Sequence, residues 1–361
     1  MRYMLYPFSI DLLPLIQSIE QLGTIDHITK LVCPTSWMNK IGDFKGQQIT
    51  TAFDDALQGV DGVIFSDCSK HSWLYMDIVK KITSCVKARK EVICCTEIKT
   101  KDLKAIQTLS TEYKINFKYL AGSEPDIKVS DSRHLSREDC IVIGIGKLLY
   151  NVDNTSSFCR MYSHLTQKGY KVVGIGDNAN YKLINCFRFP KLIFESECTE
   201  ENKVLYINAY VNTLQRLYSA DIILIHFPDG MLKYSDDCFE EFGIRSFITS
   251  QALNIDYFVL NMPIEEFSGE SFLELSKTFK YRFDFEIDAV CLESKVVDVA
   301  KSIEEEKVCY HFISEKDVEE YIAMCKSECT SVKFCSSKSI TIGEEFADDC
   351  ISKLSGNVEE F

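Results

Sequence analysis

The chain has 361 residues, of which 46% are hydrophobic and 26% charged, so it can bury a sizeable core, most simply as two α/β domains. Its formal net charge of −14 would repel a polyanion, which argues against non-specific nucleic-acid binding and against an electrostatic membrane patch. Sixteen cysteines are scattered through a long sequence without a signal peptide, so we expect free thiols and a cytoplasmic protein. No apolar stretch approaches the ~20 residues of a membrane span, so we expect no membrane insertion.

The first part of the chain alternates short apolar runs with amphipathic segments, the pattern of a parallel sheet covered on both faces. The expected strands lie at 3–8, 27–33, 62–67, 91–97 and 117–120. The expected helices lie at 11–23, 51–59 and 71–90, the first with Pro14 in its opening turns and Gly23 at its end. We therefore predict an N-terminal Rossmann-like domain over residues 1–122.

A polar stretch without apolar periodicity follows, and we predict an interdomain linker at 123–138. A second α/β domain is predicted over 139–361. Its expected strands lie at 140–146, 170–176, 221–230, 246–250, 257–263, 285–293, 308–314 and 332–337. Its expected helices lie at 156–168, 201–218, 296–306, 315–329 and 342–354. The sequence thus predicts an α/β protein with two Rossmann-like parallel-sheet domains.

The segment IVIGIGKLLYNVDNTSSF, residues 141–158, follows the general plan of a phosphate-binding loop. An apolar strand carries Gly144 and Gly146, and a loop then leads to small polar residues that open a helix. The standard motif G-x-x-x-x-G-K-S/T is not satisfied, because Leu149 stands where the second glycine belongs and Lys147 comes too early. What remains of the motif is the order of strand, loop and helix start.

Four small polar residues stand at the expected N-terminus of that helix: Asn154, Thr155, Ser156 and Ser157. Apolar residues recur at helical spacing from Phe158 onward, which fixes this start. The free N–H groups and the partial positive charge of a helix N-terminus suit an anion. The alternative is that Asn154 or Thr155 is an ordinary N-cap, a role in which these residue types are common.

Two later strands end in residues suited to the same site, since parallel sheets bind ligands at the carboxyl ends of their strands. The strand at 170–176 is followed by Asp177 and Asn178, and the strand at 221–230 ends with His226, Asp229 and Gly230. The alternative for Asp177 and Asp229 is turn formation beside a glycine.

The strand at 221–230 also resembles the strand of MinD-type ATPases that ends in Asp-x-Pro-Pro-Gly, with His226 in place of the aspartate linked to magnesium. This resemblance implies a degenerate P-loop NTPase fold for the second domain, with ATP or GTP and Mg²⁺ as candidate cofactors. It also implies inefficient hydrolysis, because the lysine of the loop and that aspartate are both missing.

Five residues of the C-terminal region suggest a metal site at first sight: Cys309, His311, Cys325, Cys329 and Cys335. Zinc and iron–sulfur sites usually contain tighter Cys-x-x-Cys pairs, and Cys325 and Cys329 share one helical stripe with apolar residues. We therefore interpret these thiols as small core residues and assign no metal site. His71 lacks the spaced companions of a catalytic triad, and the adjacent Glu240 and Glu241 are typical of a solvated face, so we assign no catalytic residue.

The chain resembles the peptide maturation system proteins of clostridial natural-product clusters, which are found beside radical SAM maturases and small cysteine-rich precursor peptides. The resembling segments of the first domain are LYPFSIDLLPLIQ, LVCPTSW and FDDALQGVDGVIFSD. Those of the second include DNTSSFCRMYSHLTQKGYKVVGIGDN, ADIILIHFPDGM, FGIRSFITSQALNIDYFVLNMP and KYRFDFEIDAVCLES. Where relatives have Gly-His-Ser-Phe-Pro, this chain has NCFRFP, so Asn185, Cys186 and Arg188 replace the glycine, histidine and serine.

The resemblance implies an accessory or scaffold protein in the maturation of a ribosomally synthesised cysteine-rich peptide. Its expected partners are the precursor peptide, a radical SAM maturase or both, and a nucleotide or phosphate ligand would bind at residues 144–157 without efficient turnover. Two alternatives stay open: an ATP- or GTP-dependent enzyme with a divergent phosphate loop that acts on the peptide or its maturase, and a purely structural partner whose site has decayed.

Overall fold

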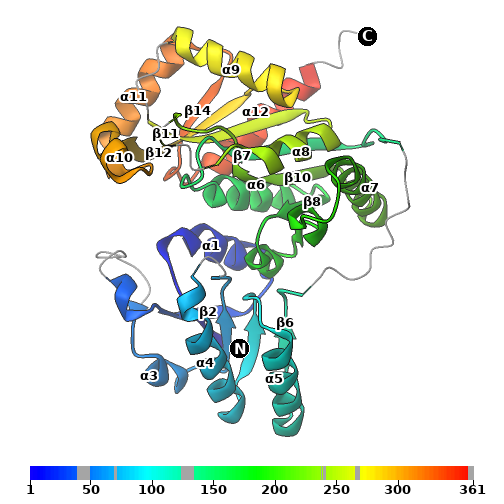
Figure 1. The fold of residues 1–361 in the computed structure, drawn as a ribbon, viewed down its shortest axis with the longest axis vertical. Coiled ribbons are helices and arrows are strands. Elements are labelled where there is room, and N and C mark those ends of the chain that lie inside the picture. The colour runs from blue at the N-terminus through cyan, green and yellow to red at the C-terminus, as the bar shows by residue number, and fades with distance from the viewer. Residues whose placement is uncertain are drawn as a thin grey trace. The chain divides into compact units, whose positions relative to one another are not determined.

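The computed structural model describes residues 1–38, 49–68, 71–122, 134–236, 238, 241–264 and 269–356 (Figure 1). The chain forms two compact units, one of Met1–Glu124 with Asn178–Arg188 and the other of Pro125–Asp177 with Phe189–Phe361. The predicted domains were contiguous, so the passage of Asn178–Arg188 into the first unit is a feature that the sequence pattern did not indicate. Residues 123–133 of the predicted linker lie outside the described residues.

The first unit is built on a parallel sheet with the strand order β3-β2-β1-β4-β5-β6. Its strands are β1 (Arg2–Tyr6), β2 (His27–Val32), β3 (Ile49–Thr50), β4 (Gly62–Phe65), β5 (Glu91–Cys94) and β6 (Phe117–Tyr119). Its helices are α1 (Leu13–Leu22), α3 (Phe53–Leu57), α4 (Tyr75–Lys87) and α5 (Thr100–Tyr113). The predicted strands and helices of this part are present, whereas the short β3 and the helix α5 were not predicted.

Both faces of this sheet are buried. The core that includes Met4 and Phe65 also contains apolar side chains of α3, α4 and α5, among them Ala56, Ile78 and Ile106. The neighbouring Leu5 and Ile64 are fully buried as well and point to the opposite face. The helix α1 packs against η4 (Ala179–Ile184), a 3₁₀ helix within Asn178–Arg188. Thr24 Oγ1 donates to the carbonyl of Leu183 at 2.6 Å.

The second unit is built on a sheet with the strand order β13-β12-β11-β7-β10-β8-β9, in which β14 pairs with β12. Its strands are β7 (Ile141–Lys147), β8 (Val172–Gly176), β10 (Ile222–Gly230), β11 (Tyr257–Ile264), β12 (Ala289–Val297), β13 (Tyr310–Phe312) and β14 (Lys333–Ser336). The short strand β9 (Phe187–Arg188), at the end of this order, consists of residues of the segment Asn178–Arg188. The pairings among β7, β8, β10, β11, β12 and β14 are parallel, and β13 pairs antiparallel with β12. The predicted fold class is therefore confirmed: two α/β units with sheets dominated by parallel strands.

The helices of the second unit cover both faces of its sheet (Figure 1). They are α6 (Thr155–Gln167), α7 (Glu200–Tyr218), α8 (Ile244–Ala252), α9 (Gly269–Phe283), α10 (Val299–Glu305), α11 (Glu315–Glu328) and α12 (Ile342–Gly356). Adjacent strand residues point to opposite faces, and His226 and Phe227 of β10 show which helices lie on each. His226 meets Phe158 of α6 edge-on at 5.5 Å, whereas Phe227 joins an aromatic cluster with Phe258, Phe279, Phe283 and Phe285. The helix α6 thus covers one face, and α9 the other.

Gly144 and Gly146, which suggested a phosphate loop, lie within β7 and under this aromatic cluster. A Cβ on Gly144 would lie 2.7 Å from Phe258 Cδ2 and 2.9 Å from Phe227 Cε2. A Cβ on Gly146 would lie 2.5 Å from Met231 Sδ. The absence of side chains at both positions allows the rings to pack directly on the strand.

The predicted strand at 246–250 is wrong, because these residues form the middle of α8. The run S-F-I-T-S contains aromatic and β-branched residues, which favour strands. Much of the buried face of this helix nevertheless consists of hydroxyl side chains: Ser246, Thr249 and Ser250. Thr249 and Ser250 donate to carbonyls of the preceding turn at 2.9 and 2.8 Å, so both are buried with a partner. The helix α9 was not predicted at all.

All sixteen cysteines are free thiols in this structure. Burial raises the pKa of Cys335 to about 12, with the nearby Glu345 adding to the shift, and Cys335 Sγ lies 3.3 Å from Glu345 Oε2. Such thiols stay protonated and pack as small core residues.

In the described part of the chain, no three metal-ligating side chains gather as a metal site, and no helix there is long and apolar enough to cross a bilayer.

The contacts around Gly144 predict a large cost for one added methyl group. Gly144→Ala should lower the free energy of unfolding by about 1–3 kcal/mol, because the two phenylalanine rings cannot both retreat within the packed core. The measurement is urea unfolding followed by far-UV circular dichroism. Gly122→Ala is the matched control, since its Cβ would meet only the Tyr119 ring at 3.6 Å, an ordinary contact. Equal stabilities of the two variants would contradict this account.

Candidate functional site

The loop between β7 and α6 is packed into the protein by its own apolar side chains. Leu148, Leu149 and Val152 are all buried. The amide of Leu148 donates to the carbonyl of Asn261 on β11 at 2.8 Å, and its carbonyl accepts from Leu232 at 3.1 Å. The loop backbone is therefore bonded on both sides to neighbouring segments.

Lys147 ends β7 and is buried, with Nζ 5.0 Å from the centre of the Tyr150 ring. In a working phosphate loop the lysine follows the second glycine and reaches the phosphates. Here the lysine precedes the loop and lies over an aromatic ring of that loop.

The N-terminus of α6 is bonded to carboxylates of the same chain. Asp153 N donates to Glu293 Oε1 at the end of the parallel part of β12, and Thr155 N donates to Asp153 Oδ1 at 3.0 Å. These are two of the amides that would have faced a phosphate. Because a carboxylate satisfies both the N–H groups and the helix dipole, Asp153 and Glu293 already fill the role of the anion.

Asn154 occupies the N-cap position of α6, but its side chain makes no capping hydrogen bond. The N-cap alternative was therefore right about the position, while Asp153 supplies the capping group. Asn154 is only 3% exposed, and its Nδ2 has no hydrogen-bond partner among the residues that the structure describes. A buried donor of this kind calls for a water or a ligand.

Ser157 is fully buried and ties α6 to β11. Its Oγ lies 2.7 Å from Asn261 Oδ1 and 3.1 Å from the carbonyl of Asn154. Asn261 is also fully buried, and its Nδ2 donates to the carbonyl of Gly146 at 2.8 Å. The hydroxyl of Ser157, a predicted ligand residue, is thus hydrogen-bonded within the protein core.

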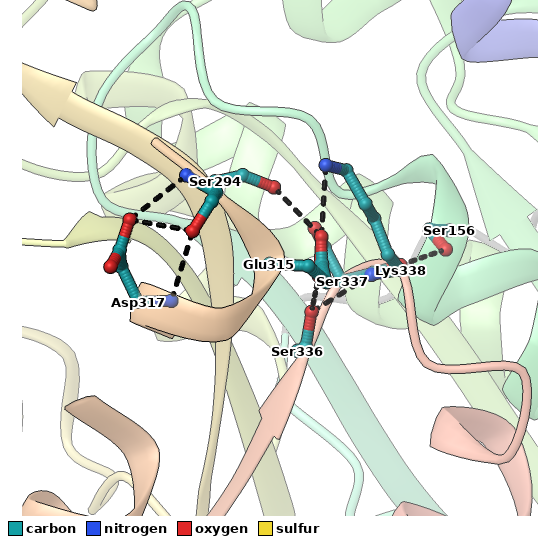
Figure 2. Close-up of polar contacts among 8 residues, drawn as sticks. Ser156, Ser294, Glu315, Asp317, Ser336, Ser337 and Lys338 are labelled. Atoms are coloured by element: carbon teal, nitrogen blue, oxygen red, sulfur yellow. Dashed lines mark hydrogen bonds and ion pairs between the residues drawn. The ribbon is translucent and has the colours of Figure 1, made fainter. Parts of the chain in front are cut away.

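Ser156 belongs to a second polar cluster, in which Glu315 is the centre (Figure 2). Glu315 opens α11 and accepts from Ser336 Oγ at 2.7 Å, from Lys338 Nζ at 2.9 Å and from Ser294 Oγ at 3.4 Å. Ser156 Oγ donates to the carbonyl of Ser337 at 3.0 Å. Burial alone would raise the pKa of Glu315, but the bonds from Ser336 and Lys338 outweigh it and lower that pKa. The ends of β12 and β14 are thus bonded to α6 and α11.

Glu293 is the most perturbed carboxyl group at this edge of the sheet. Burial raises its pKa to about 7; Lys295 Nζ, 2.7 Å away, opposes the shift, and the Asp153 carboxylate adds to it. The ionised form of Glu293 is therefore costly, although it is the form that best satisfies the amide of Asp153.

Asp177, which directly follows β8, lies beside His226 in the middle of β10, and both are predicted ligand residues. Their Oδ1 and Nδ1 atoms are 3.5 Å apart, and His226 is buried. Asn178 belongs to the first unit, where its Oδ1 accepts from Asn180 N at 3.0 Å and caps η4. The predicted set of ligand residues is therefore divided between the two units.

Asp229 and Gly230 end β10 beside a cavity of about 400 Å³. Asp229 has a φ of +64°, a left-handed conformation uncommon for a residue with a side chain, and Arg245 Nη1 holds its carboxylate at 2.9 Å. Gly230 N donates to Glu241 Oε2 at 2.8 Å, and a Cβ on Gly230 would lie 2.5 Å from the amide nitrogen of Tyr150. These contacts fix the end of β10 against the loop after β7.

The charges in this cavity are mixed. The Arg245 guanidinium stacks 5.0 Å from the centre of the Phe194 ring, and Lys203 Nζ pairs with Glu200 at 3.1 Å. Burial raises the pKa of Glu241, and the cations Lys147 and Arg245 oppose the rise. Because each cation already has a carboxylate nearby, the cavity offers little net attraction to a polyphosphate. Glu240, the other member of the predicted acidic pair, lies outside the described residues.

Three residues that organise this edge were not foreseen: Asn261, Glu293 and Arg245. Asn261 left a readable signal, because a single polar residue inside the apolar run YFVLNMP needs a buried partner. Glu293 gave none, since its partner Asp153 lies 140 residues away in the chain.

The raised pKa of Glu293 predicts a dependence of stability on pH. The folded protein binds this proton more tightly than the unfolded chain, so its contribution is complete below the usual pKa near 4.5 and is lost as pH rises to about 7. The loss amounts to about 3 kcal/mol at most. Glu293→Gln should remove this part of the slope in urea unfolding between pH 4.5 and 7. Glu319→Gln, at an exposed site on α11, is the control, and an identical slope in both variants would refute the assignment.

Comparison with known proteins establishes the fold alone. No family profile and no curated protein matches the chain. It is similar to the crystal structure of a DUF1611 family protein from Anabaena variabilis, with a TM-score of 0.60 and 10% identity over 97% of this chain and 99% of that chain. A GTPase from Pyrococcus abyssi matches with a TM-score of 0.33 and 15% identity over 59% of this chain and 96% of that chain. The 54 kDa protein of the signal recognition particle from Aeropyrum pernix, in complex with GDP, matches with a TM-score of 0.30 and 10% identity over 79% of this chain and 60% of that chain. The likeness to the DUF1611 protein shows a shared α/β fold across nearly the whole of both chains.

Proposed function

We propose that this protein is a non-hydrolysing accessory or scaffold protein in the maturation of a ribosomally synthesised cysteine-rich peptide. The observation that carries the non-hydrolysing part is the pair of bonds from Asp153 N to Glu293 and from Thr155 N to Asp153. A triphosphate at this helix N-terminus would have to displace one carboxylate and approach the other. Like charges at hydrogen-bonding distance make that exchange unfavourable.

The peptide-maturation part rests on the resemblance in sequence described above, and its partners are the precursor peptide and a radical SAM maturase. A net charge of −14 is compatible with a basic peptide partner. In this proposal the radical enzyme performs the chemistry, and the present chain brings the peptide and the enzyme together.

A second candidate is the binding of a nucleotide or another phosphate-bearing ligand beside α6. The buried Asn154 Nδ2, which has no hydrogen-bond partner among the described residues, favours it. An ATP- or GTP-dependent enzyme would need more than this donor, because Lys147 precedes the loop and His226 stands where the MinD-type strand has its aspartate.

Titration with Mg-ATP, Mg-GTP and inorganic phosphate separates these candidates. For the full chain we expect no saturable heat in calorimetry and no nucleotide hydrolysis above a protein-free blank, with or without precursor peptide. Saturable binding that is lost in Asn154→Ala, while Asn116→Ala in the first unit retains it, would establish the second candidate. Turnover stimulated by the peptide would overturn the non-hydrolysing proposal.

The scaffold role predicts a result in reconstituted maturation. Co-expression of the precursor peptide with the neighbouring radical SAM enzyme should give several-fold more modified peptide when this chain is present, measured by mass spectrometry. The Thr155→Ala chain should support the same yield, because the Thr155 hydroxyl contacts no ligand in this proposal. A yield that does not depend on the chain would contradict the role.

A further inference from the structure

A cavity in the first unit lies at the place where doubly wound sheets bind their ligands. From β1 the chain builds outward through β2 to β3 and then returns to β4 on the other side of β1. The carboxyl ends of β1 and β4 therefore flank a topological switch point, and ligands of such sheets bind outside these ends. A cavity of about 260 Å³ lies there, lined by the segments that follow β1, β2 and β4.

The floor of this cavity is fixed by hydrogen bonds. Ser66, which directly follows β4, is buried and donates through Oγ to the carbonyl of Pro7 after β1, at 2.5 Å. The next residue, Asp67, donates through its amide to Asn180 Oδ1 at 2.6 Å, and its Oδ2 accepts from Ala179 N at 3.4 Å. The Asp67 side chain is thus held in place by the segment Asn178–Arg188 of the same unit.

The lining combines carboxylates with aromatic rings. Asp11 and Asp67 supply the carboxylates, and Trp37 and His71 supply rings whose centroids are 4.9 Å apart at an interplanar angle of 64°. Trp73 stands edge-on to Trp37 at 6.4 Å. Carboxylates and an indole face together attract an organic cation, through charge-assisted hydrogen bonds and cation–π contact.

The same lining disfavours a phosphate. No lysine or arginine is among the described residues that line the cavity. The turn after β1, PFSIDL, also lacks the glycines that let a dinucleotide's pyrophosphate approach the backbone. Among the described residues, a Rossmann-like strand order is therefore combined with a cavity whose lining carboxylates are Asp11 and Asp67.

We infer that this cavity binds an organic cation, a guanidinium or primary ammonium group carried on an apolar stem. Asp11 and Asp67 would bind the charged head, Trp37 would stack on it, and Ile10 and Leu12 would contact the stem. The size of the cavity suits one side chain or one small amine. The inference concerns the first unit alone and goes beyond the proposed function, because it uses none of the residues at α6.

Intrinsic fluorescence provides the test, because Trp37 lines the cavity and Trp73, the other tryptophan of the chain, stands edge-on to Trp37. Butylguanidinium and butylammonium, titrated into the full chain up to millimolar concentration, should change the tryptophan emission saturably. Butylurea, a neutral isostere of butylguanidinium, should not. Acetyl-Gly-Arg-Gly-amide and its citrulline counterpart form the peptide arm: binding of the arginine peptide identifies a peptide side chain as a source, and binding of the free cation alone identifies a small amine.

Two substitutions make the test specific. Asp67→Asn should raise the dissociation constant of butylguanidinium about 10- to 100-fold, because one charge-assisted bond is lost. Asp11→Asn is the second variant, since Asp11 is an exposed residue that lines the cavity. Glu112→Gln, at an exposed position of α5, should bind as the unsubstituted chain does. Equal binding of butylurea, no saturable change with either cation, or unchanged affinity in both aspartate variants would each overturn the inference.

Discussion

Two hydrogen bonds, from Asp153 N to Glu293 and from Thr155 N to Asp153, determine the chemistry at the start of α6. The amides there need a negative partner, and the chain itself supplies it. A helix that begins at the carboxyl end of a parallel strand is otherwise ready to accept an anion. The Glu293 carboxylate on β12 is buried, and burial disfavours its ionised form, which raises its pKa. The two carboxylates also occupy amides at which the sequence predicted phosphate binding.

The carboxyl edges of the two sheets differ in how their space is filled. In the second unit, the part of the edge near α6 is filled by polar side chains that bond to one another, such as Ser157 with Asn261 and Ser336 with Glu315. These buried polar groups are tolerated because they bond to one another, whereas Asn154 Nδ2 has no hydrogen-bond partner among the described residues. In the first unit, the switch point is hollow and lined by Asp67 and Trp37. The carboxyl edge near α6, which the sequence predicted as a ligand site, is thus largely bonded within the protein. Cavities lie instead at the end of β10 in the second unit and at the switch point of the first unit.

The sequence was informative where burial requires apolar residues. The strand at 141–147 is recoverable from IVIGIG because both of its faces are covered. The pattern failed at 246–250, where hydroxyls form the buried face of a helix. The helix α9 was not predicted, although its buried residues Phe272, Phe279 and Phe283 follow helical spacing. The bond between Asp153 and Glu293 had no local signature, since two residues far apart in sequence meet only after the sheet has formed.

The assignment of Asn178–Arg188 to the first unit affects how the protein can be dissected. The chain passes from one unit to the other after Glu124, after Asp177 and after Arg188. A gene fragment that stops at Glu124 would therefore leave α1 without η4 and Asp67 without its amide partners. Expression of residues 1–124 alone should yield an incomplete fold. A fragment that folds by itself would need residues 178–188 joined to it through an engineered linker.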